Sequence, residues 1–597
     1  MSEFERLQVC AIAEAVGAGR TAAVDVARQV LARVQAYEAI QPQVWITRLE
    51  ERAVLEAARA VDVRIAAGET LPLAGVPFAV KDNMDVAGLP TTAACPAFAY
   101  TPERTATVVE QLIAAGAVLI GKANLDQFAT GLVGSRSPYG ACANVYNRAY
   151  VSGGSSSGSA VAVAAGLVGF ALGTDTAGSG RVPAAFNHLV GLKPTKGRWS
   201  TSGVVPACRS IDCVTVFAST VADAARVDGV AAGFDAEDIY ARRAPETLPA
   251  PVPARFRFGL PRPEQLEWFS DGQSARLFAA AVERLKAMGG EPVEIDLDPL
   301  NAAAELLYQG PWVAERTAAA LDLLTRRPAT IHPVVRGILE GGLRYSAVDT
   351  FQAEYRLRAL QRRAEALWET IDVLFLPTTG TTYRVREVLA EPLALNANLG
   401  RYTNFVNLLD MSAIALPAGF RDNATGFGVT LIGPAWADQA LLGLARRYEE
   451  IAPMPQPPPL DVSGIPARVK LAVVGAHLAA MPLHWQLTSR DAALVRRCRT
   501  APNYKLYAMA NTTPPKPALV HVGEGGSAIE VEVYELSVEA FGSFVVEVPA
   551  PLAIGTVTLD DGTEVKGFVA EPRALDGAED ITALGGWRAY IAREARV

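Results

Sequence analysis

A proline-rich run divides this sequence into two parts. Residues 452–467 read APMPQPPPLDVSGIPA and show no apolar periodicity. Such a composition is typical of a semi-rigid linker between parts that fold separately. The chain has 597 residues, which is also more than a single hydrophobic core usually accommodates. We therefore predict a first domain over residues 1–452, a linker over 453–469 and a second domain over 470–597.

Short apolar segments alternate with helical patterns through the first predicted domain. They lie at residues 76–80, 118–120, 168–172 and 373–376. Alternation of strands and helices is typical of an α/β fold, so we predict a central mixed sheet flanked by helices. The Gly- and Ala-rich stretch 159–173 is shorter than the roughly 20 residues that cross a bilayer. We predict that it forms a buried helix followed by a strand.

The second predicted domain has a different texture, with many short strand-like segments and few helical ones. The strand candidates are residues 471–474, 504–508, 518–522, 529–536 and 544–548. Asp560-Asp561-Gly562 indicates a hairpin turn inside the segment 556–569. Helical patterns are confined to 490–499 and 581–593. We predict a small β-rich α+β domain.

Charge and composition narrow the classes of function. A net charge of -8 and a pI near 5.5 argue against nucleic-acid binding, which usually needs a basic surface. The N-terminus lacks a basic head followed by an apolar core, which predicts a cytoplasmic protein without a membrane segment. The six cysteines form no CxxC pair and the five histidines no HExxH motif. We therefore expect reduced thiols, no metal and no cofactor.

Two motif matches point to chemistry that the surrounding residues do not favour. Residues 116–122 (GAVLIGK) match most of a phosphate-binding loop, but Ala123 replaces the magnesium-ligating Ser or Thr, and the segment is itself a strand. Residues 154–158 (GSSSG) match the nucleophile elbow G-x-S-x-G. The preceding residues 147–152 make a poor strand, so a histidine-based hydrolase triad is not favoured.

Three other segments carry the main functional signal. Residues 73–83 (LAGVPFAVKDN) place Lys81 at the end of an apolar strand, and 151–165 and 173–183 are loops rich in Gly and Ser. Taken singly, each is more typical of a solvated charge or a turn. Together they resemble the amidase-signature family, which pairs a GGSSxGSA loop with a downstream GTDTxGSxR loop and an upstream lysine. The resemblance covers roughly residues 13–452.

The resemblance implies a catalytic triad of Lys81, Ser155 and Ser179. Ser179 would be the nucleophile and Ser155, after a cis peptide bond from Gly154, would pass its proton to Lys81. A serine hydroxyl needs a base before it attacks. Lysine serves when it is neutral, and burial lowers its pKa because low dielectric disfavours charge. Lys81, at the inner end of an apolar strand, is well placed for that.

The loop before the expected nucleophile carries the remaining roles. Small residues let a substrate oxygen approach backbone N–H groups, which stabilise a tetrahedral oxyanion. The resemblance assigns this role to the loop that holds Thr176, Ala177 and Gly178. Asp175 and Arg181 are expected to hold the loop rather than react. Ser157, Ala177 and Gly180 depart from the commoner family residues, but none belongs to the triad.

A narrower resemblance concerns the substrate. Residues 308–316 (YQGPWVAER), 424–441 and the tail segment 474–487 look like the allophanate hydrolases. Allophanate is a small urea derivative with a carboxylate, and the resemblance implies that Tyr308 and Arg316 contact that carboxylate. The planar fork of arginine suits a carboxylate. Alternatively, Arg316 belongs to a surface helix that begins near Pro311.

The same resemblance implies two chemical steps. The first domain would release ammonia from allophanate and leave N-carboxycarbamate. The second domain, similar to a γ-glutamyl-cyclotransferase fold, would assist decarboxylation, with His477 as first candidate and His484 as second. Each histidine is alternatively a packed structural residue. A homodimer is expected, with a urea carboxylase as functional partner.

Three alternatives remain open from the sequence. The chain could hydrolyse another small amide, or act as the glutaminase-type subunit of an amidotransferase. It could also be an inactive scaffold whose tail binds another protein, although intact Lys81, Ser155 and Ser179 argue against that.

Overall fold

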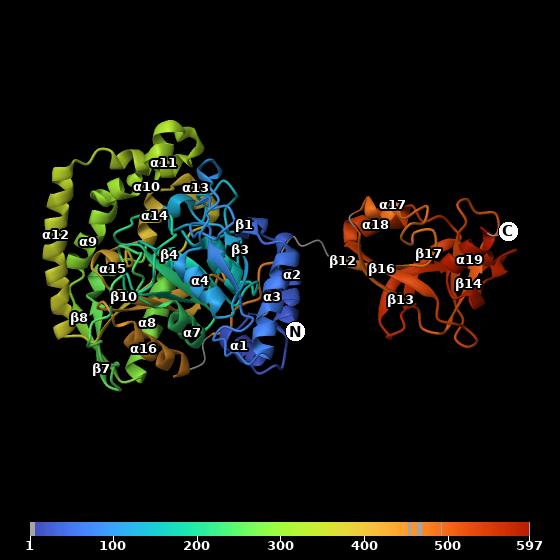
Figure 1. Ribbon diagram of the computed structural model, residues 1–597, viewed down its shortest axis with the longest axis horizontal. Helices are drawn as coiled ribbons and strands as arrows, with labels where there is room; N and C mark the ends of the chain where they lie inside the picture. The colour runs from blue at the N-terminus through green and yellow to red at the C-terminus, as the bar shows by residue number, and fades with distance from the viewer. Residues whose placement is uncertain (1–5, 452–454, 463–467, 491, 596–597) are drawn as a thin grey trace. The chain divides into compact units, whose positions relative to one another are not determined.

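The computed structural model describes residues 6–451, 455–462, 468–490 and 492–595. The chain separates into two compact units, Met1–Val462 and Ser463–Val597, which Figure 1 shows in blue to orange and in orange to red. Of the predicted linker, residues 453, 454 and 463–467 lie outside the described residues. The described stretch 455–462 is irregular, and Asp461 anchors it to the first unit by accepting from the N–H of Arg148 at 2.8 Å.

An 11-stranded mixed sheet forms the centre of the first unit, as the strand–helix alternation predicts. Its strands are parallel around β2 and again around β7, and antiparallel elsewhere. From edge to edge they are β1 (Trp45–Arg48), β3 (Val118–Ala123), β2 (Pro77–Lys81), β4 (Phe170–Asp175), β6 (Cys213–Ala218), β5 (Val190–Lys193), β10 (Ser412–Phe420), β11 (Gly426–Gly433), β9 (Val373–Pro377), β7 (Phe256–Pro261) and β8 (Gly290–Ile295).

Helices surround this sheet (Figure 1). The longer ones are α2 (Ala23–Glu38), α3 (Glu51–Ala66), α7 (Val221–Ala231), α8 (Gly272–Ala287), α9 (Asp298–Gln309), α10 (Trp312–Arg326), α11 (Pro333–Gly342), α12 (Ala347–Glu365) and α16 (Asp438–Glu450). Shorter ones are α1 (Val9–Gly17), α4 (Thr107–Ala114), α5 (Ser157–Ala164), α6 (Arg181–Phe186), α13 (Val385–Ala390), α14 (Ala394–Leu399) and α15 (Phe405–Leu408). The predicted central mixed sheet flanked by helices is confirmed.

The prediction of a buried helix and strand over 159–173 is also confirmed. Every residue of α5 is buried, and β4 follows it. Small side chains permit this packing, because a Cβ at Gly158 would lie 2.4 Å from the carbonyl oxygen of Val44. The helix therefore sits against the backbone of its neighbours, which fixes the loop that leads into it.

Three neighbouring parallel strands end at one edge of the sheet. β2 pairs in parallel with both β3 and β4, with Val80 opposite Leu172. Ligands of open α/β sheets bind outside the carboxyl ends of the strands. The register therefore brings Lys81, at the end of β2, beside the last residues of β4.

The second unit contains a five-stranded sheet and a three-stranded sheet. The larger has the order β13 (Ala493–Arg499), β16 (Glu530–Ser537), β12 (Arg468–Val473), β18 (Glu564–Ala570) and β17 (Leu552–Thr558). The smaller has the order β15 (Pro517–His521), β14 (Tyr504–Ala508) and β19 (Glu579–Asp580). The helices are α17 (Trp485–Thr488), α18 (Val538–Val546) and α19 (Trp587–Glu594). The unit is β-rich, as predicted, and β17 and β18 form the predicted hairpin.

Two local predictions in this unit are wrong. The segment 490–499 is not helical, because Ala493–Arg499 is the edge strand β13, whose Arg497 ion-pairs with Glu532 of the neighbouring strand at 2.8 Å. The apolar run 544–548 is not a strand either. Its first residues end α18, where Ser537 caps the helix and Phe544 enters the core.

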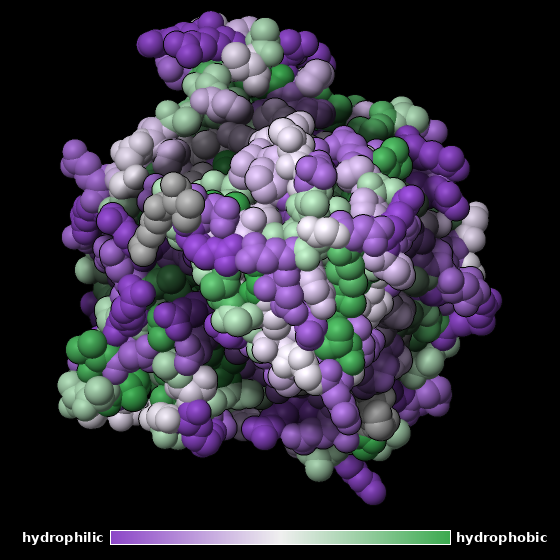
Figure 2. Space-filling model, turned by 90° about the vertical axis from the view of Figure 1, so that its right-hand side faces the viewer, coloured by the Kyte–Doolittle hydropathy of each residue, from purple (hydrophilic) through white to green (hydrophobic). Residues whose placement is uncertain are grey.

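Among the described helices, none combines the length and the apolar character needed to cross a membrane. On the face seen in Figure 2, hydrophilic residues predominate and hydrophobic ones form scattered patches.

Candidate active site

The structure brings two of the three expected triad residues into direct contact. Lys81 Nζ donates hydrogen bonds to Ser155 Oγ at 2.8 Å and to Thr174 Oγ1 at 2.7 Å. Lys81 and Ser155 are completely buried. The Gly154–Ser155 peptide bond is cis, and the Ser155 carbonyl accepts from the N–H of Asp126 at 3.0 Å. Ser155 is thus fixed through its backbone as well as its side chain.

The environment of Lys81 suits a base. Burial lowers its pKa to about 7, although the carboxylates of Asp126, Asp212 and Asp175 oppose the shift. An amine with a pKa near the ambient pH exists in comparable amounts of the neutral and charged forms. Lys81 can therefore both take and return a proton.

Asp175 organises the loop that carries Ser179. Its carboxylate accepts from the N–H groups of Gly178 at 2.8 Å and Gly180 at 3.0 Å, and from Arg181 at 2.9 Å on both oxygens. Burial alone would raise the pKa of Asp175, but the Arg181 guanidinium holds that pKa below its usual value. Asp175 and Arg181 thus support the loop.

Gly178 is required by space and by backbone conformation. Its φ is +129°, and a Cβ there would lie 2.4 Å from Thr403 Oγ1. Its N–H is already engaged by Asp175, so it is not available to a substrate oxygen. The proposed oxyanion donors therefore reduce to the N–H groups of Thr176 and Ala177.

Ser179 lies at the same site but is oriented differently from the expectation. Its side chain is almost completely buried, and its Oγ faces the carbonyl oxygen of Gly131 at 3.5 Å. Within the described part of the chain, no hydrogen bond joins Ser179 to Ser155. The relay between the two serines therefore remains a proposal.

Asp126 connects the loop 131–136 with the loop that carries Ser155, a role that its place in the sequence does not predict. Its carboxylate accepts from the N–H groups of Val133, Gly134 and Arg136. A Cβ at Gly154 would lie 2.2 Å from Asp126 Oδ2, and one at Gly131 would lie 2.5 Å from it. One side chain thus holds the loop 131–136 against the loop of Ser155. In the sequence, Asp126 lies within residues 121–130 (GKANLDQFAT), in the segment that follows strand β3.

Tyr308 and Arg316 come together in the structure. Arg316 lies on α10 and its guanidinium stacks 5.1 Å over the ring of Tyr308, which comes from α9. Its Nη1 donates to Thr130 Oγ1 at 3.2 Å and its Nη2 to Tyr308 Oη at 3.5 Å. Arg316 is 2% exposed, so it does not belong to a surface face of the helix. Because Thr130 precedes Gly131, this pair lies close to Ser179.

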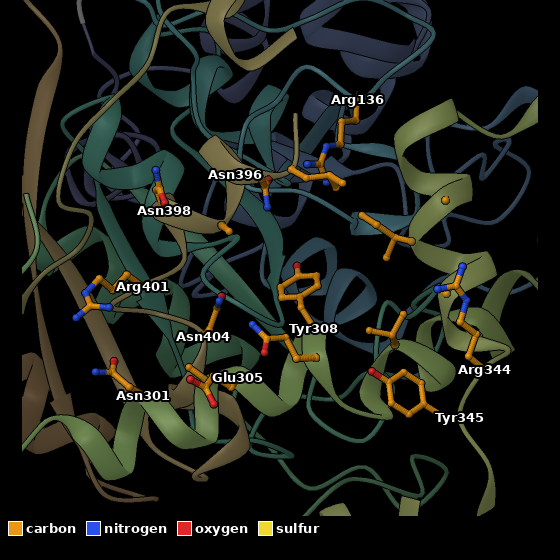
Figure 3. A pocket seen from close by; sticks show the side chains of 18 of the residues that line it. Arg136, Asn301, Glu305, Tyr308, Arg344, Tyr345, Asn396, Asn398, Arg401 and Asn404 are labelled. Carbon is orange, nitrogen blue, oxygen red and sulfur yellow. The ribbon is translucent and has the colours of Figure 1, made fainter. Parts of the chain in front are cut away.

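A cavity of about 850 Å³ opens beside this pair. Tyr308 lies near its centre in Figure 3, and Arg136 also lines it. The three expected triad residues do not line it. The cavity therefore adjoins the Tyr308 side of the site and does not contain the triad.

The second unit has a smaller pocket, of about 260 Å³, which His477 lines. His477 Nε2 lies 2.7 Å from Gln486 Oε1, and its ring stacks on Phe568 with centroids 5.1 Å apart. Burial lowers the pKa of His477. His484 instead lies 3.0 Å from Tyr534 Oη and does not line the pocket. The two histidine candidates are thus in different environments.

Comparison with known proteins gives the family. The profile of the Amidase family matches residues 28–442, which is more than half of the chain. The chain belongs to the amidase-signature family. Its residues 469–592 match a second profile, described as the allophanate hydrolase C-terminal domain. The amidase-signature assignment makes it a hydrolase.

Individual relatives match different shares of this amidase-signature chain. A crystallised Kluyveromyces lactis allophanate hydrolase is 42% identical, with a TM-score of 0.70 over 96% of this chain and 97% of that one. A urea amidolyase of Lachancea kluyveri is 46% identical over 92% of this chain. The chain spans about a third of the length of that relative. A glutamyl-tRNA(Gln) amidotransferase component of Prochlorococcus marinus is 38% identical over 67% of this chain and 88% of its own length.

Proposed function

We propose that this chain is an allophanate hydrolase that uses Ser179, Ser155 and Lys81. The observation that carries the proposal is the link through Thr130 and Gly131. Thr130 accepts from Arg316, and the next residue faces Ser179 Oγ. A carboxylate held by Arg316 would therefore lie close to the nucleophile, as the short skeleton of allophanate requires. The likeness to the Kluyveromyces lactis allophanate hydrolase supports this substrate.

The first step is amide hydrolysis. Neutral Lys81 takes the proton of Ser155, which takes that of Ser179, and Ser179 Oγ attacks the carbonyl carbon that bears the amino group. The N–H groups of Thr176 and Ala177 stabilise the oxyanion. Lys81 returns the proton through Ser155 to the leaving nitrogen, which departs as ammonia. Water then cleaves the acyl-enzyme by the same relay and releases N-carboxycarbamate.

The second step belongs to the second unit in this proposal. N-carboxycarbamate is a dianion that takes up one proton and loses carbon dioxide to give carbamate. Carbamate takes up a second proton and decomposes to ammonia and carbon dioxide. The pocket of His477 is also lined by Lys516, whose charge would attract such an anion, and by Glu547. A lowered pKa favours neutral imidazole, which has one N–H donor and one acceptor nitrogen, so His477 could relay the proton that this step consumes. His484, outside the pocket lining, is the weaker candidate.

Two partner proposals accompany this function. A urea carboxylase, which would supply allophanate, is the proposed functional partner, and the similarity to one third of a urea amidolyase supports it. A homodimer is the proposed assembly. Helix α12 supports it, because Val348, Phe351 and Tyr355 lie on one face at helical spacing and are each at least 61% exposed.

A substrate panel tests the function. Ammonia release by the full chain would be measured on allophanate, biuret, malonamate and glutamine. The proposal predicts the highest kcat/KM on allophanate. A preference for glutamine would instead favour a glutaminase-type role, and equal rates on allophanate and biuret would contradict carboxylate recognition.

A further inference from the structure

Arg136 is a buried cation without a matching anion. The residue is 2% exposed, and its guanidinium donates to the carbonyl oxygens of Thr130, at 3.0 Å, and Pro392. Its Nε is buried and has no hydrogen-bond partner. The described residues give it no ion pair. Burial of an unpaired charge is unfavourable, so a structural role alone accounts poorly for an arginine here.

A second buried guanidinium meets the first at the same threonine. Arg316 donates to Thr130 Oγ1 at 3.2 Å, while Arg136 donates to the carbonyl of that residue. Arg316 also has a buried Nε without a partner. Burial lowers the pKa of Arg136. The carboxylate of Asp126 opposes this shift, and the charge of Arg316 adds to it. Two like charges so placed repel each other, and an anion between them would relieve that repulsion.

The cavity that Arg136 lines favours the same kind of ligand. Arg344 and Arg401 line it as well, and Figure 3 shows the three arginines on different sides of Tyr308. Glu305 is the one acidic residue among the described lining residues, and it lies 3.9 Å from Arg356. The lining amides belong to Asn301, Asn396, Asn398, Asn404 and Gln309. Such a lining attracts anions and offers them hydrogen bonds.

The ligand must also reach the nucleophile. Arg136 belongs to the loop that Asp126 holds beside Ser155, and it reaches back to Thr130. Gly131, which follows Thr130, faces Ser179. A carboxylate between the two guanidinium groups would therefore lie beside Thr130. The next residue, Gly131, faces the nucleophile Ser179.

We propose that Arg136 is a specificity-determining residue that binds the substrate carboxylate together with Arg316. The inference rests on the proposed function, since it requires an anionic amide as substrate. The carboxylate enters through the arginine-lined cavity and lies between Arg136 and Arg316. It forms a charge-assisted contact with each guanidinium and relieves the repulsion between them. An amide of the same size without the charge gains nothing from Arg136.

Paired substrates test this directly. Allophanate and biuret differ only in carboxylate against amide, so kcat and KM would be measured on both for Arg136→Gln, Arg136→Lys and the control Arg326→Gln. Loss of one charge-assisted contact corresponds to roughly a 10- to 100-fold change. We expect KM for allophanate to rise by about that factor in Arg136→Gln while the constants for biuret stay within about twofold. Arg136→Lys should lie between wild type and Arg136→Gln, because lysine keeps the charge but not the fork.

The control and the contrary results are distinct. Arg326 lies on α10 like Arg316, but it is exposed, pairs with Asp322 at 2.7 Å and does not line the cavity, so Arg326→Gln should leave both substrates within about twofold. If Arg136→Gln lowers kcat/KM by the same factor on allophanate and biuret, the inference is overturned. Arg136 would then have only a structural role, linking the carbonyl groups of Thr130 and Pro392. If Arg136→Gln does not fold, the allophanate-to-biuret ratio of Arg136→Lys decides in the same way. A wild type that does not prefer allophanate would instead overturn the proposed function.

Discussion

In the first unit Lys81 is fully buried and donates to two hydroxyl groups at 2.8 and 2.7 Å, whereas in the second unit His477 is partly exposed in a pocket. Lys81 sits at a strand end whose neighbours are fixed by Asp126 and Asp175. His477 has one polar partner, Gln486, and is otherwise held by aromatic rings.

This difference matches the difficulty of the two proposed reactions. Amide hydrolysis needs a base of tuned pKa and donors placed in advance, which a rigid, dry site provides. In this proposal, loss of carbon dioxide from a dianion needs less assistance, and the pocket of His477, lined by Lys516 and Glu547, would supply it. The comparison predicts that substitutions in the first unit have large effects and that those in the second have small ones.

The largest effect is expected for Ser179. Ser179→Ala should lower ammonia release from allophanate by more than about 10⁴-fold, because no other group forms the acyl-enzyme. Ser156→Ala is the matched control, since Ser156 Oγ contacts the backbone of Thr174 at 3.1 Å. Its activity should stay within about tenfold of wild type. Normal turnover by Ser179→Ala would show that Ser179 is not the nucleophile and would contradict the proposed triad.

Arg316→Ala should have the next largest effect. It removes a buried cation from the proposed carboxylate site, and one charge-assisted contact contributes about 1.5–3 kcal/mol. We expect kcat/KM for allophanate to fall roughly 10- to 100-fold, with a smaller loss for biuret. Steady-state kinetics on both substrates check this, and equal losses would make Arg316 a structural residue.

The pH dependence of the first step sharpens the comparison further. Burial lowers the pKa of Lys81 to about 7, and the neutral amine is the proposed base. The rate should therefore rise with pH through about 7 and level off above it. At pH 6 it should be about tenfold below the plateau. A stopped-flow ammonia assay over pH 5.5–9 checks this, and a flat profile would indicate that Lys81 does not limit the reaction.

The smallest effect is expected in the second unit. His477→Ala should leave release of the first ammonia unchanged and slow production of carbon dioxide by about twofold to tenfold. This is less than general acid–base catalysis usually contributes, because the second step is proposed to need less assistance. His484→Ala is the control, because its ring contacts Tyr534 outside the pocket lining. If both variants produce carbon dioxide at the wild-type rate, the pocket has no chemical role.

Sequence patterns predicted the sheet and helices of the first unit because its apolar segments alternate with helical patterns and its motifs adjoin strand ends. They missed Asp126, Thr174 and Arg136, whose roles depend on contacts between segments far apart in the chain. In the second unit the short run 544–548 resembles a strand, but the cap at Ser537 and the burial of Phe544 decide for a helix. Short apolar runs carry too little periodicity to settle that choice.

A truncated chain tests the division of labour most directly. Residues 1–462 retain Asp461, which accepts from the N–H of Arg148, and all the residues proposed for the first step. Ammonia and carbon dioxide would be followed in parallel from this truncation and from the full chain on allophanate. The account predicts an unchanged rate for the first ammonia and a delayed release of carbon dioxide and the second ammonia. Identical time courses for both products would contradict it.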